Sequence, residues 1–136
     1  MKGFADRFAV PNGSDALRIT IKGTPTADDL AATLIACYSK HSFQHSIWDF
    51  RAASLANFSA HGFCDVARAG AAFLEKRGSG ARTAMLVSNQ AEIRLLRAFA
   101  DRARTITPIT FKASANEKEA LDWLGQAHDD EWGDRA

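Results

Sequence analysis

The chain has 136 residues, of which 46% are apolar and 24% are charged, with a formal net charge of +1. This balance is typical of one ordinary globular domain and excludes a disordered chain. The near-neutral charge lacks the basic excess of a dedicated DNA or RNA binder, so nucleic acid is not an expected partner. Two cysteines are too few for a disulfide scaffold, no apolar leader follows Met1, and no apolar run approaches the roughly 20 residues that span a bilayer. We therefore expect a cytoplasmic protein without stable membrane insertion.

The first part of the chain predicts a β-hairpin, a helix and a third strand. Apolar and polar side chains alternate on either side of a turn-forming run at 11–14, which is typical of a hairpin. Thr26 and Asp29 have the spacing of a capping box, and apolar residues then recur at helical spacing to about residue 39. The short apolar run at 46–50 predicts the next strand.

Two further helices are expected on either side of a central strand. Ser59 is the expected N-cap of a helix that continues to about residue 77, and its apolar residues form one stripe. The run at 83–87 is apolar on both faces, as in a strand inside a sheet. Asn89 and Glu92 then repeat the spacing of a capping box before another amphipathic helix.

The chain ends with an edge strand, a short helix and a tail. The strand at 109–111 is expected at an edge because Pro108 has no N–H to donate to a ladder. The helix after it is expected to end at Gly125. Residues 1–125 then make the domain, and 126–136 make a polar, acidic C-terminal tail.

The order of these elements, β-β-α-β-α-β-α-β-α, predicts a single α/β domain with a mixed sheet and right-handed crossovers. Ligands of such sheets gather where strands end and helices begin, because unpaired N–H groups and positive helix ends converge there. We therefore expect a ligand-binding rim at this end of the sheet. Its candidate residues are Thr24, Thr26, Asp49, Asn57, Ser88, Asn89 and Gln90.

The element order resembles that of a STAS domain, the fold of bacterial anti-sigma-factor antagonists. Three segments are more narrowly similar to the SpoIIAA-like group of small bacterial proteins: Ile19-Thr-Ile-Lys-Gly23, Arg82-Thr-Ala-Met-Leu-Val87, and Ile109-Thr-Phe111 followed by Glu119-Ala-Leu-Asp-Trp-Leu124. The resemblance covers residues 4–125 and implies helices mainly on one face of the sheet. The group is related by fold to lipid-binding CRAL-TRIO domains, and this relation implies a lipid-like ligand as one alternative.

Ser59 occupies the position of a regulatory serine in this resemblance. STAS antagonists carry an Asp-Ser-Ser-Gly motif in which a partner kinase phosphorylates a serine, and the matching stretch here is Asn57-Phe58-Ser59-Ala60. Only the second serine of the motif is retained. Ser59 is therefore a candidate phosphorylation site by resemblance, while helix capping is the interpretation that the residues favour.

The residues provide no convincing catalytic set. Cys64, His61 and Asp49 are of the right types for a nucleophile, a base and an orienting group, but Cys64 lies at the margin of a buried helical stripe. We expect an inert, packed thiol, no catalytic residue and no cofactor.

A metal site is not expected either. Cysteine and histidine recur every fourth residue at Cys37, His41 and His45. These side chains would share a face only on a continuous helix, and the serines at 39 and 42 favour an end to the helix before His45.

Arginine is concentrated in the second half of the chain and could bind an anionic headgroup or an acidic partner. Acidic residues are interleaved with the arginines, so a solvated helix face is the favoured interpretation. The arginines concerned are Arg77, Arg82, Arg94, Arg97, Arg102 and Arg104.

Aromatic residues on the third strand suggest an interface. Strand alternation places Trp48 and Phe50 on one face and Ile47 and Asp49 on the other. If helices cover only one face, an uncovered aromatic face would be a protein interface or an apolar pocket. The alternative is that Trp48 belongs to the core.

These observations lead to a non-enzymatic interaction or regulatory module whose partner is another protein or a second copy of the chain. The first alternative is a carrier of a small apolar or lipid-like ligand. A weaker alternative is a phosphorylated switch at Ser59.

Overall fold

The computed structural model describes residues 2–9, 15–41 and 43–133, and it describes side chains at 16–41 and 43–125. Strands and helices alternate along the chain. They are β1 (Lys2–Ala9), β2 (Asp15–Gly23), α1 (Ala27–Lys40), β3 (His45–Ala53), α2 (Ala60–Gly70), the 3₁₀ turn η1 (Ala71–Phe73), α3 (Leu74–Arg77), β4 (Arg82–Leu86), α4 (Gln90–Ala103), β5 (Thr110–Ser114) and α5 (Glu117–Gly133).

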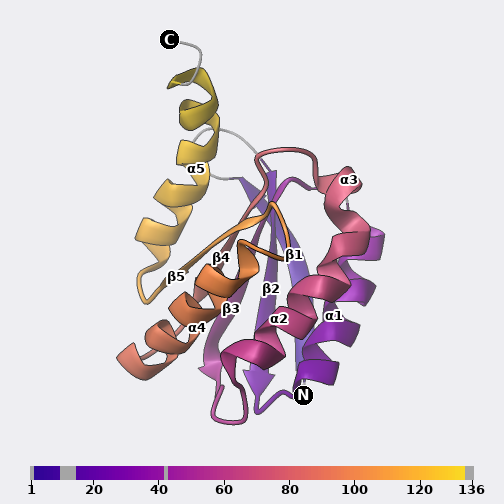
Figure 1. Cartoon of the computed structure of the whole chain (residues 1–136), viewed down its shortest axis with the longest axis vertical. Coiled ribbons are helices and arrows are strands. Elements are labelled where there is room, and N and C mark those ends of the chain that lie inside the picture. The colour runs from indigo at the N-terminus through magenta and orange to yellow at the C-terminus, as the bar shows by residue number, and fades with distance from the viewer. Residues whose placement is uncertain (1, 10–14, 42, 134–136) are drawn as a thin grey trace.

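The described strands form one mixed sheet in the order β1-β2-β3-β4-β5 (Figure 1). β1 runs antiparallel to β2, and each later strand is parallel to the one before it. The predicted hairpin pairing, mixed sheet and edge position of the last strand are confirmed, while the turn at 11–14 lies outside the described residues. Because strand order follows chain order, right-handed crossovers place α1, α2 and α4 on the same face, as predicted.

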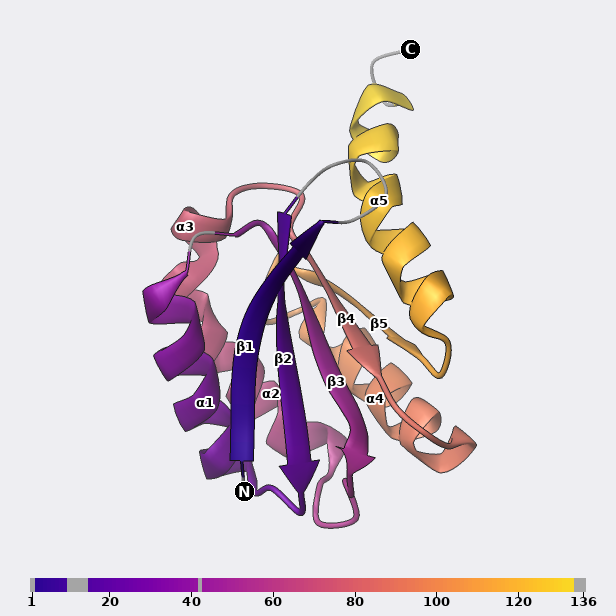
Figure 2. The ribbon, with the colours of Figure 1, turned by 180° about the vertical axis from the view of Figure 1, so that it is seen from behind.

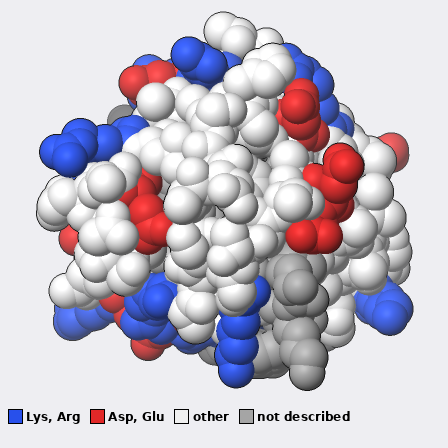
Figure 3. All heavy atoms as spheres, turned by 90° about the horizontal axis from the view of Figure 1, so that it is seen from below, with Lys and Arg blue, Asp and Glu red and all other residues white. Residues whose placement is uncertain are grey.

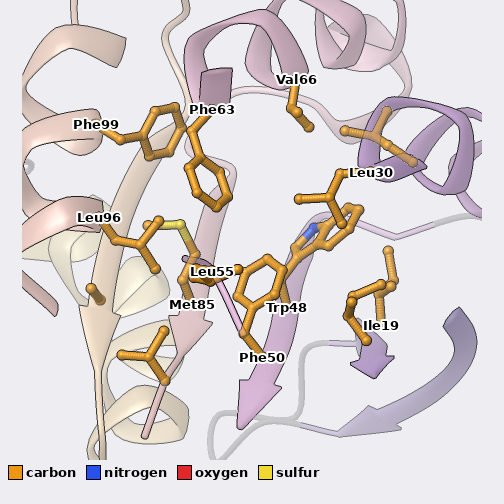
Figure 4. Close-up of a cluster of buried hydrophobic side chains, with 14 of the residues drawn as sticks. Ile19, Leu30, Trp48, Phe50, Leu55, Phe63, Val66, Met85, Leu96 and Phe99 are labelled. Carbon is orange, nitrogen blue, oxygen red and sulfur yellow. The ribbon is translucent and has the colours of Figure 1, made fainter. Parts of the chain in front are cut away.

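The larger core lies between the sheet and these three helices (Figure 4). Leu17, Ile19 and Ile21 of β2 are fully buried there, while the alternate residues of this strand face the other side. Ring contacts run through the core from Phe50 to Phe63, with centroids 5.9 Å apart, and on to Phe99 at 5.6 Å. This aromatic chain joins the sheet to α2 and α4.

Trp48 and Phe50 belong to this core, so the prediction of an exposed aromatic interface at these residues is wrong. Their exposed fractions are 5% and 1%. The strand alternation was right, but the face that carries the aromatic residues is the one that the helices cover. In the parallel register Trp48 lies beside Ile19, and β2 turns its apolar face to the same helices.

A smaller core lies on the opposite face, under α5. It contains Ala16, Ile47, Ala84, Leu86, Ala120 and Leu124. The three alanines leave room for α5 to pack closely, and the helix lies along β4 and β5 (Figure 2). Contrary to the prediction, this helix does not end at Gly125, and the segment predicted as a tail is helical to Gly133. Gly125 does not adopt the positive φ of a helix-ending glycine, and helix-forming residues follow it.

Side-chain caps fix the helix starts that the sequence predicted. Thr26 and Asp29 form a reciprocal capping box on α1, and the Asn89 side chain accepts from the backbone N–H of Glu92 on α4. The predicted helix from Ser59 to residue 77 is interrupted after Gly70 by η1. It ends at Gly78, whose φ of 83° is a left-handed conformation that a residue with a Cβ rarely adopts.

Candidate functional site

Six of the seven predicted rim residues lie where the parallel strands end, and all six are exposed. They are Thr24, Thr26, Asn57, Ser88, Asn89 and Gln90. The loops that carry them are joined by hydrogen bonds: the N–H of Ser54 donates to the Gly23 carbonyl over 2.8 Å, and the N–H of Leu55 donates to Glu92 Oε2 over 3.0 Å. These bonds hold three loops as one surface.

Figure 3 looks onto this end of the molecule. Uncharged residues make up the middle of the face, aspartates and glutamates flank it, and most lysines and arginines lie toward its margin. Capping already occupies the side-chain oxygens of Thr26, Ser59 and Asn89, which accept hydrogen bonds from helix backbone N–H groups. The middle of the rim, as far as the described residues show it, is therefore an ordered and uncharged surface.

Asp49, the seventh predicted rim residue, does not lie on the rim. β3 continues to Ala53, so Asp49 lies inside the strand, and its side chain is on the α5 face of the sheet. There it joins two arginines and a glutamate. Arg51 binds Asp49 through two side-chain bonds of 2.9 and 2.8 Å, Arg18 binds it at 2.8 Å, and both arginines reach Glu117.

This network fixes the charge of Asp49. Burial alone would raise the pKa of the Asp49 carboxyl, but the hydrogen bonds from Arg51 and Arg18 outweigh burial and lower that pKa from 3.8 to about 2. The pKa of Glu117 is also lowered, chiefly by its hydrogen bond from Arg18. A carboxylate held by two guanidinium groups is a poor proton acceptor at neutral pH. Asp49 therefore joins β2, β3 and α5, and it is not poised as a base.

The capping role of Ser59 is confirmed. Its Oγ accepts a hydrogen bond of 3.1 Å from the backbone N–H of Gly62, and the residue has the extended conformation of an N-cap. The side chain is exposed at the rim end of α2. Ser59 thus has a structural role that explains the serine at this position.

We expect Ser59→Ala to lower the free energy of unfolding by about 1 kcal/mol, because one N–H at the start of α2 loses its partner. Ser59→Asp should restore most of this loss, since a carboxylate caps the same N–H and favours the positive helix end. Urea unfolding followed by circular dichroism measures both changes. Ser39→Ala is the matched control, because Ser39 donates back to the Ile35 carbonyl inside α1 and caps nothing. Equal stabilities for wild type and Ser59→Ala would contradict the capping role.

The candidate catalytic set is not assembled. Cys64 belongs to α2 and is buried in the core, His61 is exposed on the same helix, and Asp49 lies on the other face of the sheet. The candidate metal ligands are also spread over different elements, with Cys37 in α1 and His45 buried at the start of β3. Among residues 16–41 and 43–125 no group of three such side chains could hold a metal ion.

A buried polar chain at the other end of the sheet was not predicted. The Trp48 indole Nε1 donates to the Tyr38 hydroxyl over 2.9 Å, this hydroxyl lies 2.9 Å from Ser46 Oγ, and Ser46 Oγ lies 3.0 Å from Thr83 Oγ1. Arg77 completes the chain. It was expected on a solvated helix face, but its exposed fraction is 6% and its Nη2 lies 3.5 Å from Ser46 Oγ.

His45 is buried beside this chain, with an exposed fraction of 1%. Its Nδ1 accepts a hydrogen bond of 3.1 Å from the backbone N–H of Arg82, which requires the unprotonated nitrogen. Burial, followed by the positive charges of Arg77 and Arg82, lowers the pKa of His45 from 6.5 to about 4. The imidazole is therefore neutral at pH 7.

A small apolar cavity of about 50 Å³ lies in the main core next to the polar chain. Figure 4 shows the side chains around this region, with Phe63 and Val66 on one side and Trp48 and Phe50 on the other. Aromatic side chains dominate its lining, namely Tyr38, Trp48, Phe50, Phe63, Phe99 and Phe111. Arg77 is the charged residue among those that line it. The cavity thus brings aromatic rings and a buried cation together around one space.

No protein-family model and no curated protein matches this chain. Among solved structures, the chain is similar to an uncharacterized DUF3478-family protein from Shewanella loihica PV-4 that has a SpoIIAA-like fold. The two share 18% sequence identity with a TM-score of 0.57, and the match covers 90% of this chain and 93% of that chain. The anti-sigma factor antagonist SpoIIAA in its unphosphorylated form is also matched, with 16% identity, a TM-score of 0.46 and coverage of 89% and 97%. Within the described residues no helix is both long and apolar enough to cross a membrane. The strand order, the position of α1, α2 and α4 on one face and the likeness to the Shewanella protein show that this chain has a SpoIIAA-like fold.

Proposed function

We propose that the chain is a non-enzymatic interaction module that binds a partner protein through its strand-end rim and acts as a regulator in the cytoplasm. The observation that carries this proposal is the rim itself: six exposed, uncharged polar residues on three loops that hydrogen bonds hold together. Protein interfaces are depleted of charge at their centres, and a preorganised surface loses little entropy on binding. Two free thiols, Cys37 and Cys64, are in keeping with a reducing compartment.

The absence of an assembled acid–base pair among the described residues also supports a binding role. The buried carboxylate, Asp49, is neutralised by two arginines, and the buried imidazole, His45, accepts from a backbone N–H. Each group is occupied in holding the fold. The partner is either another protein or a second copy of this chain.

A photo-crosslinking amino acid at position 57 of the full chain tests the proposal in cells. We expect a discrete adduct whose partner is identified by mass spectrometry, and an adduct of twice the chain mass would identify a homodimer. With that partner purified, Gln90→Arg on the rim should weaken binding by about tenfold or more, because a charge is buried at the interface.

The matched control places the same crosslinker at Ala72. This residue is exposed in η1, which follows the end of α2 that is remote from the rim. Equal crosslinking from both positions, or an affinity for the partner that Gln90→Arg leaves unchanged, would contradict the proposal that the rim is the interface. A switch at Ser59 is a weaker proposal that the same assay tests: it requires Ser59→Asp and Ser59→Ala to differ in affinity for the identified partner.

Carriage of a small apolar or lipid-like ligand is a second candidate function. The apolar cavity of about 50 Å³ beneath α2 favours it. Well-packed cores contain few voids larger than a water molecule, so an aromatic-lined cavity beside a buried cation is a feature that a ligand would use. Mass spectrometry of the purified protein under native and denaturing conditions tests it, because a carried ligand adds mass that denaturation releases.

A further inference from the structure

Arg77 carries a buried positive charge without a buried negative partner among the described residues. Its Nε donates to the Gln44 carbonyl over 3.0 Å, and its Nη2 donates to the Arg82 carbonyl over 2.9 Å. The guanidinium also lies over two aromatic rings, 5.3 Å from the centroid of Phe43 and 5.6 Å from that of Tyr38. In the part of the chain that the structure describes, no carboxylate forms an ion pair with it. Nη1 makes no hydrogen bond there and is in contact with solvent, since no buried side-chain nitrogen in that part lacks a partner.

Burial of this guanidinium without a negative partner costs the isolated protein free energy of folding. Carbonyl oxygens and ring faces offset part of the cost of removing a guanidinium from water, but they carry no net charge. An anion bound at Nη1 would supply the missing charge and a charge-assisted hydrogen bond. The guanidinium is therefore prepared for an anionic ligand.

The cavity beside Arg77 limits the size of that ligand. The cavity is partly open to solvent, and one water-sized group needs about 10–15 Å³ of such space, so its 50 Å³ holds roughly four groups of that size. A groove of about 220 Å³ beside Arg104 shares Thr107, Ile109 and Phe111 with the cavity, so the two spaces adjoin each other at these side chains. A ligand of six to eight non-hydrogen atoms would fill the cavity and extend toward this groove.

The lining limits the chemistry of the rest of the ligand. Apart from Arg77 and the hydroxyls of Tyr38, Thr83 and Thr107, the walls are apolar and largely aromatic. The hydroxyl groups of Tyr38 and Thr83 already lie within hydrogen-bonding distance of Ser46. A sugar or a nucleotide would leave many polar groups unpaired there, whereas a hydrocarbon chain would not.

We propose that this cavity binds a short-chain monocarboxylate, with its carboxylate on Arg77 and its hydrocarbon chain against Trp48 and Phe63. A carboxylate suits a single guanidinium because its charge of −1 matches that of one arginine. This inference rests on the carrier function, the second candidate above, and names the ligand class for it. It is independent of the rim and of any protein partner.

Hexanoate is the probe, and hexanamide is its neutral match of nearly the same shape. In ¹H–¹⁵N spectra of the full chain, we expect hexanoate to shift the indole N–H signal of Trp48 and the Nε–H signal of Arg77. Substitution of Trp48 by Phe and of Arg77 by Lys assigns the two signals. Hexanamide should bind at least about tenfold more weakly, because it cannot pair with the guanidinium charge.

Two variants of α2 separate binding from folding. Ala67 lines the cavity, so Ala67→Leu should fill it and abolish the hexanoate shifts. Ala69→Leu makes the same change two residues away at a position that does not line the cavity, and it should leave binding unchanged. Arg77→Met should reduce the affinity for hexanoate to that for hexanamide. If Arg77→Met fails to fold, the comparison of Ala67→Leu with Ala69→Leu still decides whether hexanoate binds in the cavity.

Three results would overturn the inference. Equal affinity for hexanamide and hexanoate would refute carboxylate recognition while leaving an apolar carrier. Tighter binding of palmitate than of hexanoate would refute the short chain and favour a lipid carrier. No shift of either signal at millimolar hexanoate would refute both the inference and the carrier function.

Discussion

Replacing Phe50 by alanine is expected to lower the free energy of unfolding by about 3–5 kcal/mol and to leave the molecular mass in solution unchanged. Phe50 is 1% exposed and is among the largest fully buried side chains. Its ring stacks on Trp48 with centroids 6.1 Å apart and meets the edge of Phe63 at 5.9 Å. Truncation would remove both contacts and enlarge a cavity that Phe50 already lines, because packed helices cannot fully collapse into the space.

Urea unfolding gives the change in stability, and light scattering coupled to size exclusion gives the mass. The matched control is Ile35→Ala, since Ile35 is a large apolar side chain that is 49% exposed on α1. That change should lower the free energy of unfolding by less than about 1 kcal/mol. If Phe50→Ala left stability unchanged and altered the mass, Phe50 would lie at an interface between copies and not in the core.

The aromatic strand shows what alternation can and cannot predict. It correctly separated Trp48 and Phe50 from Ile47 and Asp49, because the period of a strand is a local property. It could not decide which face the helices cover, because that depends on register with the neighbouring strand. Trp48 lies beside Ile19 in the sheet. Because β2 is apolar only on the face that carries Ile19, this pairing places both side chains under the helices.

Local signals predicted the helix starts and the order of the elements along the chain, whereas the candidate ligand site depends on distant contacts. Thr26 and Asn89 cap helices with partners three residues away, and such spacings can be read directly. The partners of Arg77 come from Gln44, Ser46 and Arg82, so nothing near it in sequence indicates burial. Gly78 indicates that the helix ends immediately after Arg77, but it does not indicate that the Arg77 side chain is buried.

Asp49 was misplaced for a related reason. The strand was predicted over the short apolar run at 46–50, but the Arg51 side chain pairs with Asp49 on the same face and β3 continues to Ala53. Alternate residues of a strand share a face, so a carboxylate and an arginine two positions apart could have suggested this pair. Its second partner, Arg18, comes from β2 and depends again on register.

The second large effect concerns pH, because His45 is buried in its neutral form. Its pKa is about 4 in the folded chain and 6.5 in its ordinary state, so between these values the unfolded chain binds one more proton than the folded chain. Stability is then fully present above pH 6.5 and is lost as the pH falls toward 4. We expect the free energy of unfolding to decrease by about 2–3 kcal/mol between pH 7 and pH 4.5 from this group.

Urea unfolding at half-unit intervals from pH 7 to pH 4.5 tests this effect. Asp49 does not interfere in this window, since a carboxyl pKa lowered from 3.8 to about 2 weakens the fold only as the pH falls below 4. His45→Asn should flatten most of the decrease, because the asparagine Oδ1 can accept from the Arg82 N–H as Nδ1 does and carries no proton to titrate. His61→Asn is the control, as His61 is exposed on α2 and should leave the slope unchanged. An equal slope in wild type and His45→Asn would mean that the acid sensitivity has another origin, and it would contradict the neutral, buried imidazole that joins the starts of β3 and β4.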